Sequence, residues 1–247
     1  MAPYQLTLDR LAQAFTVRDI MVPRVKLVCT PDEPSARTRL VENADHDVIA
    51  IEQDGKVVSY LERGAERQRP IRLEDMVSDS TSILDLVDVL QHRVFCYVVG
   101  AQRIVGYVHF SDLNNHLAKL PYFVLFEAVE SRVANLIGDR ITEAVLDQVL
   151  DPQRCDGLRK AMARQKSDRS DLGWYALLSF NELIRFAVHL GSIDLRQTDI
   201  EVISRVRNLV AHAAGEPLVE AHADVKRLVL ARSVCMSAVG WLQGISA

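Results

Sequence analysis

Two stretches in the first half of this 247-residue chain share one pattern, a pair of short apolar runs separated by a turn. The first pair is 47–51 and 57–61, and the second is 94–99 and 104–108. Short apolar runs around Asp54-Gly55, or around a turn that begins with Gly100, are typical of β-hairpins. The second pair begins 94 − 47 = 47 positions after the first. The chain is therefore predicted to repeat one hairpin-containing unit, which strongly limits its fold.

Each hairpin follows a stretch with helical character. In the second copy, Ser82 or Thr81 is the candidate N-cap of a helix. Its apolar residues follow the spacing i, i+3, i+4, i+7, and they are Ile83, Leu86, Val87 and Leu90. Asp19-Ile20-Met21 also matches Asp75-Met76-Val77, at 75 − 19 = 56 positions. The predicted unit is strand, helix, strand, strand, helix, with a linker at 64–70.

The tandem resembles a pair of cystathionine β-synthase (CBS) domains over about residues 16 to 120. The resemblance lies in Val-Arg-Asp-Ile-Met-Val-Pro-Arg at 17–24, in the Asp-Gly-Lys hairpin, and in Gly-Tyr-Val-His-Phe-Ser-Asp at 106–112. It implies β-α-β-β-α repeats at 16–65 and 66–120, after an N-terminal helix or extension at 1–15. It also implies a cleft for an adenine nucleotide (AMP, ADP or ATP) as a regulatory ligand.

Within this resemblance, three residues are candidates for ligand binding. Asp112 is expected at the ribose, where a carboxylate can accept hydrogen bonds from two vicinal hydroxyls. His109 occupies a position where the family commonly has Thr or Ser, and Arg24 is the candidate for the phosphate. The first copy has Glu62 and Ala65 at the positions of His109 and Asp112, so we expect one ligand cleft and not two. The structural alternative is that Asp112 caps the helix after it.

Beyond Leu120, helical periodicity replaces the hairpin pattern, and 121–247 is predicted to be an all-α helical bundle. The fold class is therefore an α+β N-terminal module followed by an all-α domain. Helices are expected at 123–137, 141–150, 155–166, 172–190, 198–213 and 223–242. Thr198, with Glu201 three residues later, has the form of a capping box that would begin the fifth helix.

The fifth helix carries residues suited to phosphate chemistry. Arg207 can hold a phosphate in a bidentate fork, and His212 can exchange a proton near neutral pH. On an ideal helix Asn208 and His212 share a polar stripe with Arg205, opposite an apolar face, whereas Arg207 lies on the other flank. Arg207 could contact a phosphate bound over this stripe only by extending its long side chain around the helix.

This helix resembles the RxxxxH helix of the HEPN superfamily of small all-α domains, and 174–184 is similar to the helix that precedes that motif. Active members are metal-independent ribonucleases. The resemblance implies His212 as acid/base, Arg207 at the scissile phosphate and Asn208 as an orienting residue, with Asn181 or Glu182 as a polar partner from the preceding helix. Such sites are usually built at a two-fold interface, which implies a homodimer.

Structural roles are the alternative for the same side chains. His212 can bind the free carbonyls at the end of its helix, and Arg207 can pair with Asp199 or Glu201. Glu182 can pair with Arg185 on its own helix. Two functions remain open: a nucleotide sensor that controls a metal-independent endoribonuclease, or a non-enzymatic adenine-nucleotide sensor whose helical part dimerises or docks a partner.

Composition sets limits on both functions. A net charge of −4 removes any broad electrostatic attraction for nucleic acid, so RNA would have to be bound locally. The four cysteines are scattered, with no metal-binding spacing, so no metal is expected. The sequence has no apolar run that approaches a membrane span and no secretory leader pattern, and we expect a cytoplasmic protein without a membrane partner.

Overall fold

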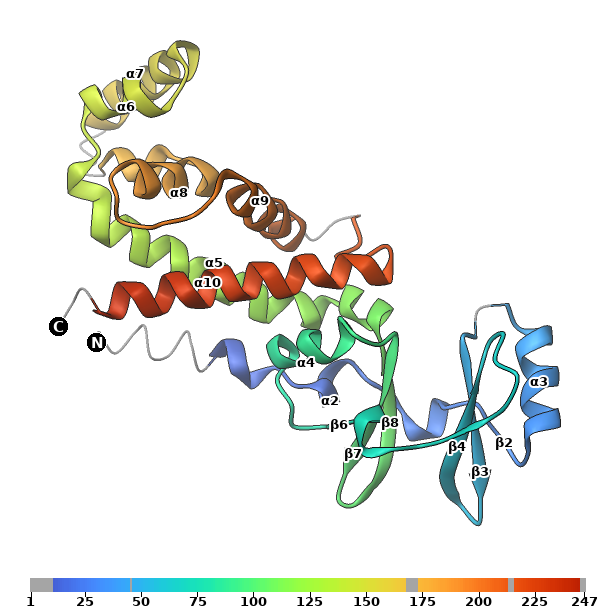
Figure 1. Cartoon of the computed structure of the whole chain (residues 1–247). Helices are drawn as coiled ribbons and strands as arrows, with labels where there is room; N and C mark the ends of the chain where they lie inside the picture. The colour runs from blue at the N-terminus through green and yellow to red at the C-terminus, as the bar shows by residue number, and fades with distance from the viewer. Residues whose placement is uncertain (1–10, 45, 168–172, 213–215, 245–247) are drawn as a thin grey trace. The chain divides into compact units, whose positions relative to one another are not determined.

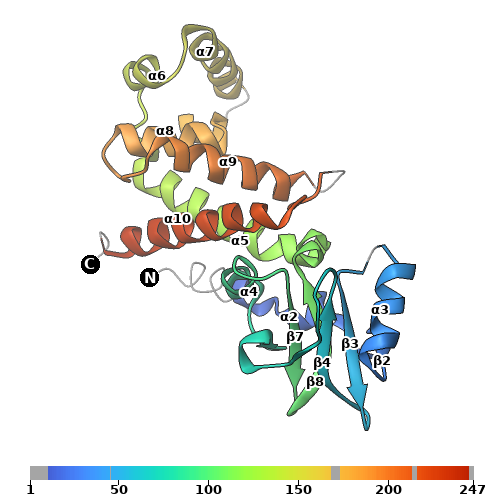
Figure 2. The ribbon, with the colours of Figure 1, turned by 45° about the vertical axis from the view of Figure 1, so that its right-hand side comes forward.

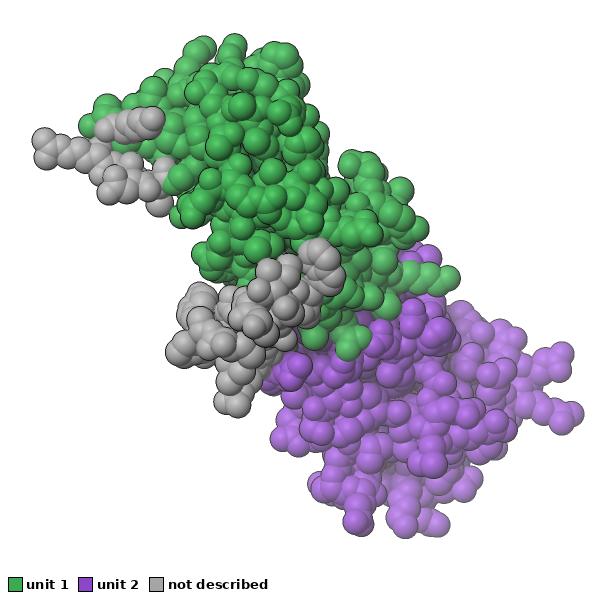
Figure 3. Space-filling model, turned by 60° about the vertical axis from the view of Figure 1, so that its left-hand side comes forward, with its two compact units in different colours: residues 1–12, 119–218, 226–247 green, residues 13–118, 219–225 purple. Residues whose placement is uncertain are grey.

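The structure is a computed structural model that describes residues 11–44, 46–167, 173–212 and 216–244. Most of the expected N-terminal extension, residues 1–10, therefore lies outside the described residues. The chain forms two compact units (Figure 3). Unit 2 contains Gln13–Ala118 and Val219–Val225, and unit 1 contains the rest. The chain therefore enters unit 2 twice.

Unit 2 holds two four-stranded sheets, seen at the right of Figure 1. The first has the order β2-β3-β4-β5, with strands Cys29–Thr30, Val48–Gln53, Lys56–Glu62 and Arg69–Pro70. The second has the order β1-β8-β7-β6, with strands Val22–Pro23, Arg103–His109, Phe95–Gly100 and Met76–Ser78. The helices of this unit are α2 (Val17–Ile20), α3 (Glu33–Glu42) and α4 (Ile83–Leu90). The predicted mixture of helix and strand is confirmed.

Both predicted hairpins are confirmed, and they share one register. Ala50 pairs with Tyr60 in β3/β4, and Tyr97 pairs with Tyr107 in β7/β8, 47 positions later in each strand. The edge strands obey the same spacing, because β1 pairs with β8 and β5 pairs with β4. Each repeat thus contributes a short strand to the sheet of the other repeat, and the two repeats form one unit.

The expected match at a spacing of 56 is wrong. Ile20 lies in helix α2, whereas its expected match Met76 lies in strand β6, so the two tripeptides are not equivalent. The partner of Met76 at the common spacing of 47 is Cys29, and both residues begin a strand that runs parallel to its hairpin. The two tripeptides contain similar residue types, and this similarity produced the mistaken alignment.

The helix before the second hairpin forms as predicted. Its N-cap is Ser82, whose hydroxyl accepts a hydrogen bond from the Asp85 N–H at 3.1 Å. Ile83, Leu86 and Leu90 are completely buried, which confirms the apolar stripe. The helix expected directly after Asp112 differs, because Phe110–Asn114 forms a 3-10 helix, η3, and α5 begins only at His116.

The described residues of unit 1 that form regular structure are helical, and Figure 2 shows how these helices pack. The α-helices are α5 (His116–Ile137), α6 (Glu143–Val149), α7 (Pro152–Ser167), α8 (Phe180–His189), α9 (Gln197–Ala211) and α10 (Val225–Gly244). The first three residues of α5 belong to unit 2. Phe126 of α5 meets Phe180 of α8 edge to face at 5.5 Å between ring centroids. Tyr122 of α5 donates to the Leu228 carbonyl of α10 at 3.4 Å.

Several expected helix starts are wrong: α5 begins at His116 and not at 123, and α7 begins at Pro152 and not at 155. The helix predicted over 172–190 is a 3-10 turn, Trp174–Leu177, followed by α8, because Ser179 caps a new helix start; position 172 lies outside the described residues. Helix α9 begins at Gln197 with Arg196 at the N-cap, so Thr198 is not the cap. The Asp199 carboxylate instead binds the Arg196 guanidinium, with both distances at 2.9 Å. A charged pair across the first turn replaces the hydroxyl cap.

The short segment Val219–Val225 completes unit 2. The Asn114 amide donates to the Val219 carbonyl at 2.8 Å and accepts from the Val219 N–H at 2.9 Å. The His222 ring also lies 5.6 Å from the Phe110 ring, centroid to centroid. A part of the chain more than a hundred positions downstream is thus held by side chains at the end of the second repeat.

Candidate functional site

Asp112 and His109 line one pocket of unit 2, which we name the Asp112 pocket. Its volume is about 270 Å³. It is lined by Val22, Lys26, Leu27, Val28, His46, Asp47, Val48, Ala50, Tyr97, Tyr107, His109, Ser111 and Asp112. The edge strand of the first repeat and the hairpin end of the second therefore both contribute. Apolar and aromatic walls with a few polar groups are the usual composition of a small-molecule site.

Two polar atoms of this pocket are buried without a hydrogen-bond partner among the described residues, the Tyr97 hydroxyl and His109 Nε2. The Ser111 N–H lies 3.2 Å from His109 Nδ1, so Nδ1 accepts and the neutral ring carries its hydrogen on Nε2. Asp47 Oδ2 lies 3.4 Å from this nitrogen without forming a hydrogen bond. Buried groups without partners are uncommon, so these two atoms distinguish this pocket from the rest of the core of unit 2.

Asp112 has a capping role as well as a place in the pocket. Its carboxylate accepts a hydrogen bond from the His109 N–H at 2.8 Å. Burial raises the pKa of this carboxyl, and the hydrogen bond from His109 acts against that rise. Burial likewise lowers the pKa of His109, although Asp47 acts in the opposite direction. Asp112 is therefore not the N-cap of the following helix, as the structural alternative expected, but the third residue of η3, whose carboxylate binds back to the N-cap His109.

The equivalent position in the other half of the tandem is filled by aromatic rings. Phe95 stands where Val48 stands in the first repeat, and Tyr97 stands where Ala50 stands. Phe95 lies 5.4 Å from Tyr60 and 5.8 Å from Tyr97, between ring centroids. The carboxylate is missing there too, because Ala65 replaces Asp112 at the spacing of 47.

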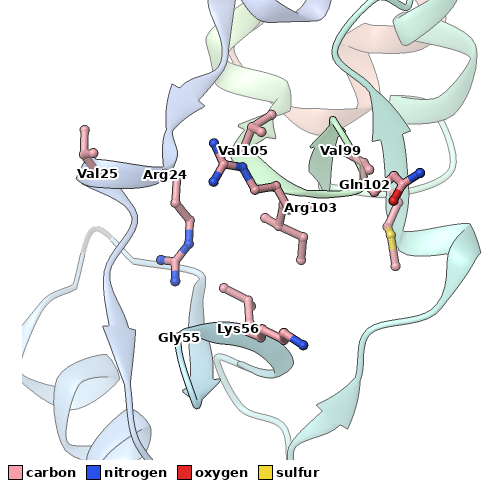
Figure 4. A pocket seen from close by; sticks show the side chains of 11 residues that line it. Arg24, Val25, Gly55, Lys56, Val99, Gln102, Arg103 and Val105 are labelled. Carbon is pink, nitrogen blue, oxygen red and sulfur yellow. The ribbon is translucent and has the colours of Figure 1, made fainter.

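Arg24 does not line the Asp112 pocket. Its guanidinium pairs with the Glu52 carboxylate and donates to Cys29 Sγ at 2.9 Å. It lines another cavity of unit 2, which we name the hairpin cavity, between the two hairpin turns (Figure 4). The structure therefore separates Arg24 from the other two predicted ligand residues. The lysine that lines the Asp112 pocket is Lys26, which the sequence did not single out.

The polar stripe of α9 forms a groove in unit 1, which we name the α9 groove. Its volume is about 600 Å³, and Arg205, Asn208 and His212 line it together, as the helical geometry predicted. Its other lining residues are Asn181, Glu201, Ser204, Leu209 and Glu216. Asn181 donates to the Ser204 hydroxyl at 2.9 Å, which joins α8 to this face of α9. The apolar face of α9 is buried, with Ile203 and Val206 each only 1% exposed.

Two residues predicted for this site lie elsewhere. Arg207 faces α5, where its Nη2 lies 3.8 Å from Glu130 Oε2, so it does not pair with Asp199 or Glu201 as the alternative expected. Glu182 binds the Arg154 guanidinium at 2.7 and 2.9 Å and accepts from the Ser179 N–H at 2.8 Å. Burial would raise the pKa of Glu182, but these hydrogen bonds outweigh it and lower the pKa.

The end of α9 is satisfied by a lysine. The buried Lys119 ammonium lies 3.5 Å from the Leu209 carbonyl and 3.2 Å from the Glu216 carbonyl. His212 is the C-cap residue, and its N–H donates to the Asn208 carbonyl at 3.0 Å. The imidazole forms no hydrogen bond with the described residues and is exposed to the groove. The expected binding of end carbonyls by this imidazole is therefore wrong.

Within the described ranges, no three His, Cys, Asp or Glu side chains are grouped so that they could hold a metal ion. Nor does any helix in these ranges combine the length and the apolar character needed to cross a bilayer.

Three solved structures of CBS domains are similar to part of this chain. The CBS domain of a proposed transporter from Clostridium difficile 630 is 17% identical and covers 43% of this chain and 96% of its own, with a TM-score of 0.33. The CBS domain of the bacterial CNNM/CorC family Mg²⁺ transporter is 16% identical, covers 46% and 82%, and has a TM-score of 0.34. The same domain in complex with the inhibitor IGN95a is 17% identical, covers 46% and 83%, and has a TM-score of 0.34.

No protein-family model matches the chain, and no curated protein matches it either. Likenesses at these TM-scores carry no functional argument. The geometry of the chain's own pockets therefore bears the functional conclusion.

Proposed function

We propose that unit 2 is a ligand sensor and that the Asp112 pocket binds an adenine nucleotide that regulates the chain. The observation that carries this proposal is the pair of buried polar atoms without partners, Tyr97 Oη and His109 Nε2, at a pocket with aromatic walls. An adenine base offers ring nitrogens that accept hydrogen bonds and a flat face for stacking. The Asp112 carboxylate would accept hydrogen bonds from the ribose hydroxyls.

The ligand phosphate would be met by Lys26 and not by Arg24. Lys26 is exposed at the pocket rim, and its side chain has no hydrogen bond or ion pair with the described residues. Arg24 lines the hairpin cavity and not this pocket. We expect AMP to bind more tightly than adenosine, and Lys26→Gln to remove most of that difference. Calorimetric titration of both ligands measures it.

A pocket-filling substitution tests the location of the site. Val48→Phe places in the first repeat the ring that the second repeat already carries as Phe95, so the fold tolerates it in one half. We expect it to abolish binding of adenosine and AMP, because the ring occupies a cavity of about 270 Å³. Val41→Phe on α3 is the matched control, since Val41 is 84% exposed. Equal binding by wild type and Val48→Phe, or no binding of AMP, ADP or ATP, would refute the proposal.

Asp112 needs a substitution that keeps its capping role. Asp112→Asn retains a side-chain oxygen for the His109 N–H but loses the negative charge. We expect adenosine binding to weaken by at least about tenfold, which corresponds to about 1.4 kcal/mol. An unchanged Kd would show that the carboxylate does not contact the ribose.

A second candidate function, cleavage of RNA in the α9 groove, is favoured by one observation. Asn208 and His212 line one open groove together with Arg205, which brings an amide, an imidazole and a guanidinium to a single face. We propose that His212 moves the proton of an attacking 2′-hydroxyl and that Arg205 or Arg207 binds the phosphate. In this proposal a homodimer completes the groove, and the nucleotide bound by unit 2 regulates cleavage through its differential affinity for two states.

Single variants distinguish these roles. With EDTA present, we expect cleavage of a labelled single-stranded RNA to be lost in His212→Ala. Arg205→Gln and Arg207→Gln identify which guanidinium binds the phosphate, because only the first lines the groove. RNA left equally intact by wild type and by His212→Ala would refute cleavage and favour a non-enzymatic sensor whose helical unit dimerises or docks a partner.

A further inference from the structure

The hairpin cavity lies where the two halves of the tandem present equivalent residues. Its volume is about 820 Å³. Three pairs of its lining residues are 47 positions apart, the spacing of the repeats, and they are Gly55 with Gln102, Lys56 with Arg103, and Val57 with Ile104. Both hairpin turns therefore open onto one space. None of its lining residues is shared with the Asp112 pocket.

The charged side chains that line this cavity all have the same sign. Arg24, Lys56 and Arg103 line it, and no carboxylate does. Figure 4 shows Arg24 at one side of the opening, with Arg103 above and Lys56 below. The side chains of Lys56 and Arg103 form no hydrogen bond or ion pair with the described residues. Of the acidic residues adjacent to lining residues, Glu52 pairs with Arg24, Asp75 with Arg93 and Asp79 with Arg18, and Asp54 precedes Gly55 in the turn.

Cations gathered around one space repel each other, and an anion placed between them removes this repulsion. Guanidinium groups also bind phosphate oxygens in a bidentate fork, which favours phosphate over a monovalent anion. Arg24 is preoriented for this role, because Glu52 and Cys29 hold its guanidinium in place.

The remaining walls are apolar. They are formed by Val25, Val57, Met76, Val99, Ile104 and Val105. A free phosphate would leave these walls in contact with water, whereas an apolar substituent on the phosphate would cover them. A cavity of this volume lies within the range of small-molecule sites.

The second turn adds backbone strain at the same place. Ala101 and Gln102 have φ values of 49° and 64°, in the left-handed region, although neither is glycine. The equivalent first turn uses Asp54 and Gly55, which suit such a turn. Gln102 is less favourable than glycine in this conformation, but its amide side chain lines the cavity. Residues in such strained backbone conformations are found most often at ligand and active sites.

We propose that the hairpin cavity binds a phosphate or diphosphate ester of an apolar group, with Lys56, Arg103 and Arg24 around the phosphate and the valine walls around the apolar group. This ligand site is distinct from the Asp112 pocket and does not depend on the proposed adenine nucleotide.

Geranyl diphosphate is the probe, and calorimetry on the full chain measures its binding. We expect saturable binding that weakens at least about tenfold in Lys56→Gln/Arg103→Gln, because two charge-assisted contacts are lost. The charge-matched control is Arg67→Gln/Arg72→Gln, which removes two exposed cations outside both pockets. We expect this control and Asp112→Asn to bind within about twofold of wild type.

Several outcomes would overturn the proposal. The first is that geranyl diphosphate does not bind saturably. The second is that wild type and Lys56→Gln/Arg103→Gln bind it equally well. The third is that Asp112→Asn or the control pair loses this binding. Tighter binding of a glutamate-rich peptide than of geranyl diphosphate would assign the cavity to an acidic protein segment instead. Adenosine binding, measured on the same samples, reports separately on the Asp112 pocket, so the two proposals fail independently.

Discussion

Burial lowers the pKa of His109 in the folded chain. Its Nδ1 accepts the Ser111 N–H, an interaction that only the unprotonated nitrogen can form. Its side chain is only 15% exposed, so a proton added to the ring would be poorly solvated. With Nδ1 accepting, Nε2 is the hydrogen-bond donor of the neutral ring, and it is this atom that the proposed ligand would meet.

This position makes the stability of unit 2 depend on pH. The pKa of His109 is lower in the folded chain, so as the pH falls through about 6.5 the unfolded chain takes up a proton first. The free energy of unfolding therefore decreases with falling pH in this range. His109→Asn keeps a side-chain acceptor and does not titrate, so we expect its urea midpoint to fall less between about pH 7.5 and about pH 5.5. An equal fall in both proteins would contradict this role. Asp112, whose raised pKa acts in the opposite direction, is present in both.

For individual residues, the sequence pattern predicted the position of some side chains but not the interaction partners of others. The helical period placed Arg205, Asn208 and His212 on one stripe, because neighbours on one helix follow from its geometry alone. The partner of Arg207 is Glu130 on α5, and no local rule relates two residues so far apart in the chain. Tyr97 and Lys26 were missed because each reaches the Asp112 pocket only after the repeats pair.

Among the elements, the two hairpin turns differ in strain although their strands share one register. Gly55 has a φ of 75°, and an added Cβ there would meet nothing within 4 Å. Gln102 has a φ of 64° at the equivalent position. A side chain at position 55 would therefore meet backbone strain and no steric clash at its Cβ.

Exchanging these residues should change stability in opposite directions. We expect Gln102→Gly to raise the free energy of unfolding by about 1 kcal/mol, because glycine adopts this conformation without a Cβ clash. Gly55→Gln should lower it by about the same amount. Urea unfolding at one pH measures both. No gain in the first variant, or no loss in the second, would show that the turns are not strained as their φ values indicate.

The edge strands explain why the repeat spacing was only partly recognised. β1 and β5 contain two residues each, and each contains a proline, so neither has the alternation that predicts a strand. Their pairing with the hairpin of the other repeat is a long-range contact. Once this pairing is known, the spacing of 47 applies to every strand of unit 2.

Across the whole molecule, unit 2 depends on a segment far away in the chain. Val219–Val225 belongs to this unit, and Asn114 holds it with two hydrogen bonds to Val219. His222 Nε2 also lies 2.5 Å from the Leu90 carbonyl oxygen. A fragment that ends at Ala118 would lack these contacts, so functional work on unit 2 needs the full chain.

Removing the Asn114 amide tests this dependence. We expect Asn114→Ala to lower the free energy of unfolding by about 1–3 kcal/mol, because the Val219 N–H and carbonyl lose their partners. Gln53→Ala, at an exposed position, is the control and should change it by less than about 0.5 kcal/mol. Hydrogen exchange provides an independent measurement, since the Val219 amide should exchange faster only in Asn114→Ala. Unchanged exchange there would refute the holding role.

The hairpins, the cap at Ser82 and the polar stripe of α9 followed from sequence because each depends on residues that are close along the chain. The pairing of β1 and β5 across the repeats, the separation of Arg24 from Asp112, and the removal of Arg207 and Glu182 from the α9 groove depended on the folded chain. Ion pairs and edge-strand pairs form between residues that only long-range packing brings together. That packing cannot be predicted from the spacing of residues along the sequence.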